Sequence, residues 1–196
     1  MSLRPEISGF SLEALFSLQG AKGREALPEL QAKLRFRDPA RMQEAHAILQ
    51  GAIDESDRWA DLEGETEMHV AVARVLAHHG QTHLGTTSNH WTMRAFWDFH
   101  KEHQANVPRE GGKYLWLFSR GRGIFTGRPI KSSWSFYGFL WHKEVKALRD
   151  ALVQFRAADP CRADHRIGSE FNFLGELLDW LTAIEAAGKD LWFDCR

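Results

Sequence analysis

Apolar residues in the N-terminal half of the chain recur every three or four positions, the spacing that places them on one face of a helix. Ser11 is suited to cap the first of these segments, and a glycine follows most of them, where helices often end. The pattern predicts helices from Ser11 to Gly20, from near Pro28, from Pro39 to Gly51 and from Glu65 to His79. We therefore expect this half of the chain to be a layer of helices.

The C-terminal half adds three helical patterns. They predict helices that end near His103, that cover Val145–Phe155, and that run from about Ser169 to Ala187 with Gly188 as the cap. The first of these has its cap candidates in Thr86–Asn89, and a strand is the alternative for this segment because it is rich in aromatic residues.

Runs of aromatic residues indicate strands. Tyr114–Phe118 and Ile124–Thr126 are separated by Arg120-Gly121-Arg122-Gly123, which predicts a β-hairpin. A second aromatic run, Trp134–Leu140, leads into the Val145 helix, and Leu191–Phe193 is expected to form a terminal strand. The expected fold is α+β: a predominantly helical single domain over residues 1–196 with a small antiparallel hairpin or sheet.

Composition agrees with a chain that folds around its own core. Hydrophobic residues make up 43% and charged residues 26%, as in soluble globular proteins, and eight Trp and thirteen Phe predict a bulky aromatic core. The two cysteines, Cys161 and Cys195, lack the spacing of a disulfide framework or a zinc site, which favours a reducing compartment. Without an apolar run of signal-peptide or membrane-span length, we expect a cytoplasmic protein that does not bind membranes.

Four segments carry a resemblance to a known family: LEALFSLQG, LAHHG, SFYGFLWHKEVKALRDAL and the ending AAGKDLWFDCR. In their order and spacing the chain resembles a family of bacterial proteins known only as a domain of unknown function. The resemblance implies no activity and transfers no catalytic residue. Such families usually carry Ser or Thr as the cap of the late helix, where this chain has Trp141-His142.

Histidines are concentrated in one region, with six of the ten between His78 and His103. Spacings of three and four residues can place two imidazoles on one helix face, as metal sites require. Gly80, however, interrupts one such pair, and no HExxH motif occurs. A metal-dependent enzyme that uses residues 78–103 is therefore an alternative, with the candidate ligands His79, His83, Asp98, His100 and His103.

Other catalytic signatures do not occur. The GxSxG, GxxxxGK[ST] and GxGxxG motifs are missing, and neither cysteine lies in a context that would activate a thiolate. We therefore expect no cofactor, and the sequence favours a protein without enzymatic activity.

The segment from Arg109 to Lys131 has six basic residues and one acidic residue, in a chain whose formal net charge is −1. Its candidate partner-binding residues are Arg120, Arg122, Arg128 and Lys131. Gly121 and Gly123 are expected to allow a turn that projects the neighbouring arginines outward. Such a basic and aromatic segment can bind an acidic protein, bind nucleic acid, or serve only as a soluble hairpin tip.

These observations together favour a cytosolic bacterial protein-binding module whose partner is a protein, with an immunity or accessory factor as one form of that hypothesis. Nucleic-acid binding through the basic 109–131 loop and the metal-dependent enzyme are the alternatives.

Overall fold

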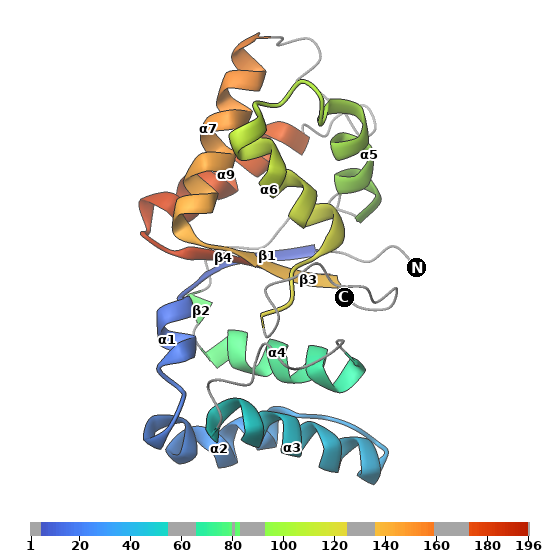
Figure 1. The fold of residues 1–196 in the computed structure, drawn as a ribbon, viewed down its shortest axis with the longest axis vertical. Coiled ribbons are helices and arrows are strands. Elements are labelled where there is room, and N and C mark those ends of the chain that lie inside the picture. Colours follow the sequence, from blue (N-terminus) through green and yellow to red (C-terminus); the bar gives the residue numbers. More distant parts are fainter. Residues whose placement is uncertain are drawn as a thin grey trace.

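The computed structural model describes residues 5–54, 66–79, 81–82, 93–124, 136–158 and 173–195. Eight helices and four strands are assigned in this part of the chain (Figure 1). In order they are β1 (Pro5–Phe10), α1 (Leu12–Phe16), α2 (Ala21–Lys33), α3 (Pro39–Asp54), α4 (Glu67–His79), β2 (Gln81–Thr82), α5 (Met93–His103), α6 (Arg109–Arg120), β3 (Phe136–Leu140), α7 (His142–Ala158), α9 (Phe173–Ala186) and β4 (Asp190–Cys195). The predicted α+β class, mostly helical with a small antiparallel sheet, is confirmed.

The sheet joins strands that lie far apart in the sequence. Its order is β2-β1-β4-β3, and every adjacent pair is antiparallel. The N-terminal strand β1 pairs along its whole length with the C-terminal strand β4, from Pro5 opposite Cys195 to Phe10 opposite Asp190. Figure 1 shows this sheet between two groups of helices, with α5, α6, α7 and α9 on one side and α1 to α4 on the other.

Alternation along the strands divides the core in two. In β4, Leu191 and Phe193 belong to the hydrophobic cluster formed with α5, α6, α7 and α9, whereas Trp192 belongs to the cluster formed with α1 to α4. Tyr137 and Phe139 of β3 lie on the same side as Trp192. Because neighbouring strand residues point to opposite faces, a fully apolar strand can be buried on both sides.

The predicted hairpin is wrong, because Tyr114 to Arg120 lie in α6. A short, continuous apolar run fits a helix as well as a strand, so the contacts of the segment decide its conformation. Gly111 of α6 packs directly on α7: a β-carbon there would lie 2.3 Å from Cβ of Ala151 and 2.4 Å from the carbonyl oxygen of Ala147. Glycine at this position thus allows two helix backbones to approach closely.

The N-terminal helices also differ from expectation at several of their ends. Gly51, expected to end the third helix, lies inside α3, which continues to Asp54. The second helix begins at Ala21 rather than near Pro28, and Pro28 lies inside it. Gly20, expected to end the first helix, instead precedes α2 with a φ of 77°. The first helix ends earlier, at Phe16, with Ser17 as its C-cap.

The N-terminal cap of α7 comes from the side chains of Glu144 and Asp190, which the sequence pattern did not reveal. The Trp141 backbone N–H donates to Oε2 of Glu144 over 3.0 Å, the reciprocal half of a capping box. The His142 N–H donates to Oδ1 of Asp190 over 2.7 Å, and the Leu12 N–H donates to Oδ2 of the same carboxylate over 2.8 Å. Asp190 therefore caps α1 and α7 together and links one helix from each side of the sheet.

Candidate functional site

One side of α6 carries cations and an exposed tryptophan in a single row. Arg109, Lys113, Trp116 and Arg120 are all exposed, and at 100° per residue their directions fall within about 60° of arc. The opposite side of the helix is buried through Gly111 and Leu115, which face α7 and the core. The amphipathic pattern of α6 therefore creates a narrow surface row that runs the length of the helix.

The row continues onto α5 through Trp97. The guanidinium of Arg120 lies 4.9 Å from the centre of the Trp97 ring, a cation–π contact worth about 0.5–1 kcal/mol at an exposed site. Trp97 and Trp116 remain 41% and 37% exposed, so both rings keep area for a partner. We call Arg109, Lys113, Trp116 and Arg120 of α6 together with Trp97 of α5 the α6 basic face.

The positive charge of this face is not neutralised within the described part of the chain. There, Arg109, Lys113 and Arg120 form no ion pair with a carboxylate, whereas the cations Arg74, Arg122 and Arg149 do. The nearby imidazole of His100 adds no charge at neutral pH, because burial, and then the positive charge of Arg120, lower its pKa below the ordinary 6.5. The face is therefore a local positive surface on a nearly neutral protein.

Arg122 does not extend beside Arg120 as expected. Gly121 has the positive φ anticipated for a turn, 73°, but Gly123 does not. Nη1 of Arg122 donates to Oε2 of Glu144 over 2.7 Å, and its guanidinium lies 4.6 Å from the centre of the Phe139 ring. With only 17% of its side chain exposed, Arg122 anchors the chain after α6 to the start of α7.

The predicted partner-binding residues thus have different locations. Arg120 lies in the α6 basic face, Arg122 lies in an internal ion pair, and Arg128 and Lys131 are outside the described residues. Sequence reasoning missed Trp97 and placed Trp116 in a strand of the predicted hairpin. Reading Arg109 to Arg120 with a helical period would have aligned the three cations with Trp116.

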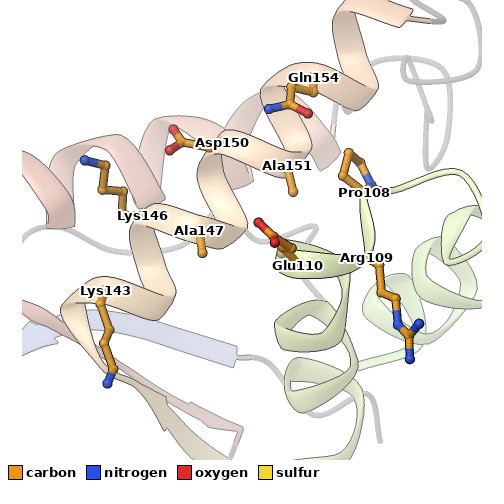
Figure 2. A pocket seen from close by; sticks show the side chains of 10 residues that line it. Pro108, Arg109, Glu110, Lys143, Lys146, Ala147, Asp150, Ala151 and Gln154 are labelled. Atoms are coloured by element: carbon orange, nitrogen blue, oxygen red, sulfur yellow. The ribbon is translucent and has the colours of Figure 1, made fainter.

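A cleft opens where the first turn of α6 meets α7 (Figure 2). It has a volume of about 530 Å³ and lies along the close contact of Gly111 with the helix opposite. Figure 2 shows Ala147 and Ala151 of α7 pointing toward Glu110, and these short side chains leave the space open. Lys143 and Lys146 line the cleft from α7, and Arg109 lines it from α6, so it is continuous with the α6 basic face.

The histidine region is divided by the sheet. His79 ends α4 on one side, whereas Asp98, His100 and His103 lie on α5 on the other, and His83 is outside the described residues. His103 is 1% exposed and packs between the rings of Phe99 and Phe155, at 4.9 and 5.2 Å between centroids. Among the described residues, no three His, Cys, Asp or Glu side chains form a group that could hold a metal ion.

Within the ranges that the structure describes, no helix is long and apolar enough to cross a membrane. Comparisons of the chain with protein-family models, with curated proteins and with solved structures give no match. The chemistry of the α6 basic face and of the adjoining cleft is therefore the basis on which a function can be argued.

Proposed function

We propose that this protein is a non-enzymatic binding module whose α6 basic face binds an acidic surface of a partner protein. The observation that carries the proposal is the row of three cations without carboxylate partners in the described chain, combined with two exposed tryptophans. Accessory and immunity factors are proteins of this kind. We also propose that it acts in the cytoplasm of a bacterium: two cysteines without framework spacing favour a reducing compartment, and the family that the chain resembles is bacterial.

The residue types support a protein interface. Tryptophan and arginine are enriched among the residues that contribute most to protein binding, because they combine a large contact area with directional polar contacts. Trp97 and Trp116 supply the area, while Arg109, Lys113 and Arg120 supply a field that steers an acidic partner to this side of the molecule. Tryptophans should mainly slow dissociation, and cations should mainly speed association.

The test is a charge-removal variant, Arg109→Gln with Lys113→Gln and Arg120→Gln. Glutamine keeps a helix propensity close to that of Lys and Arg, so α6 should remain folded. A partner captured with the wild-type protein would be identified, purified and measured by surface plasmon resonance at two salt concentrations. We expect the variant to associate about tenfold more slowly at low salt, and the difference to shrink at high salt as screening increases.

A matched control removes the same charge elsewhere. Lys22, Arg37 and Arg156 are exposed residues outside the α6 basic face, and changing all three to Gln also lowers the net charge by three. This control should associate at the wild-type rate. Equal rates for the two triple variants would contradict the proposal, and tighter binding of a single-stranded oligonucleotide than of any protein would favour the nucleic-acid alternative.

A further inference from the structure

We infer that the partner presents a linear acidic segment, which lies extended along α6 with one end in the α6–α7 cleft. This inference rests on the proposed function and specifies the kind of partner. Its basis is the shape of the positive surface: the three cations of α6 form a row one side chain wide, and the Arg109 end of that row opens into the cleft. A row that ends in a hollow suits a strand-like segment better than a broad acidic surface.

The spacing of the row supports an extended conformation. Arg109 and Lys113 are four residues apart on the helix, about 6 Å along its axis, and Arg120 lies about 16 Å from Arg109. In an extended chain, side chains on the same side repeat every two residues, or about 6.6 Å. Acidic residues at the first two alternate positions therefore lie opposite Arg109 and Lys113. The third and fourth alternate positions fall within about 3 Å of Trp116 and Arg120, a difference that these long side chains can span.

The charges beside the row favour a narrow occupant. Glu110 projects from α6 about 100° around the helix from Arg109, and Figure 2 shows its carboxylate directed toward Ala147 and Ala151 of α7. A helix with its side chains is about 10–12 Å across, so an acidic helix on this row would also lie over Glu110 and be repelled. An extended segment can follow the cations and meets that carboxylate only at the cleft, where Arg109, Lys143 and Lys146 outnumber it.

The cleft supplies further positive charge at the end of the row. Lys143 and Lys146 of α7 line the cleft, as Arg109 does from α6, and neither lysine forms an ion pair within the described ranges. Asp150, which also lines the cleft, is paired with Arg149. Glu110 also lines the cleft, but Arg109, Lys143 and Lys146 outnumber it, so the end of the segment that enters the cleft should be acidic.

The experiment uses two synthetic peptides of identical composition. Acetyl-Glu-Ser-Glu-Ser-Leu-Ser-Glu-amide has the alternating pattern, and acetyl-Glu-Glu-Glu-Leu-Ser-Ser-Ser-amide has the same charge in one block. Binding to the full-length protein would be followed by the indole N–H signals of Trp97 and Trp116 in proton–nitrogen correlation spectra, assigned with Trp97→Phe and Trp116→Phe. We expect both signals to shift with the alternating peptide, at an affinity at least about fivefold higher than that for the block peptide.

Substitution of the two cleft lysines tests whether one end of the acidic segment enters the cleft. Lys143→Gln with Lys146→Gln should weaken binding of the alternating peptide about fivefold, the range expected for two exposed ion pairs. Lys22→Gln with Arg37→Gln removes the same charge far from the cleft and should leave binding unchanged.

Equal affinity for the two peptides, no shift of either indole signal up to about 10 mM peptide, or no effect of the cleft variant would overturn this inference. In any of these cases, the charge-removal variant of α6 distinguishes the two proposals. If that variant still bound the purified partner protein more weakly than the wild type, the proposed function would stand and only the inference of a linear segment would be wrong. If that variant bound the partner as well as the wild type does, both the proposed function and the inference of a linear segment would be wrong.

Discussion

Replacing Gly111 with alanine tests how closely α6 and α7 pack and, with it, whether residues 109–120 are a helix. The new β-carbon would lie 2.3 Å from Cβ of Ala151 and 2.4 Å from the carbonyl oxygen of Ala147. Contacts this short are far inside van der Waals distance, and a helix carbonyl can move only if α7 moves with it. The two helices would have to separate, and that would disturb the cluster that contains Leu115, Leu148 and Leu152.

The expected change in stability is the sum of two opposing effects. Alanine is favoured over glycine inside a helix by about 1 kcal/mol, whereas overpacking of a tight contact costs about 1–3 kcal/mol. Because a backbone carbonyl is involved, we place the cost at the upper end and expect a net loss of about 2 kcal/mol. For a protein of this length, that loss lowers Tm by about 4–8 °C.

Gly112 is the matched control. A β-carbon at this position would lie 3.3 Å from the carbonyl oxygen of Val107 and 3.4 Å from Cγ1 of the same residue, so a small adjustment would accommodate it. Gly112→Ala should keep most of the helix-propensity gain and melt at or slightly above the wild-type temperature. Calorimetry and urea titration of the two variants provide the comparison. If Gly111→Ala melted as high as Gly112→Ala, the close crossing of α6 and α7 described above would be incorrect.

Three further predictions concern the effect of individual side chains on the free energy of unfolding. Asp190→Ala should lower the free energy of unfolding by about 2–3 kcal/mol, since it removes a cap from two helices, while Asp190→Asn should lose less in urea titration because asparagine also caps helices. Glu144→Ala should cost about 3 kcal/mol by removing the carboxylate that pairs with the largely buried Arg122, and a much smaller loss in the same assay would show that this ion pair contributes little to stability. Stability should fall as the pH drops through about 6.5, because burial lowers the pKa of His69 and of His100 in the folded state, so the unfolded chain binds more protons there. Urea titration from pH 7.5 to 5 should give a shallower decline for the double variant His69→Gln with His100→Gln, and an unchanged decline would count against this assignment.

The sequence predicted a helix end correctly where the residues at that end determine it. Ser11 caps α1 by accepting the Ala14 N–H over 3.1 Å, and Gly188 ends the last helix with a φ of 63°. The helices that begin at Pro39 and end at His79 and His103 also match their predicted limits. Capping, glycine conformation and helical spacing act over a few neighbouring residues, so a sequence contains them in full.

Contacts between distant segments were decided by the tertiary structure. The short aromatic run after Gly112 fits a strand as well as a helix, and in the structure it forms α6, which packs closely on α7 at Gly111. That conformation brings Arg109, Lys113, Trp116 and Arg120 into one row, and the packing of α5 adds Trp97. Partners such as Glu144 for Arg122, or Asp190 for two helices, lie 22 to 178 residues away in the chain. Composition and spacing identified a basic aromatic segment, but whether it forms a helix, and therefore which of its residues face solvent together, depends on packing against distant elements.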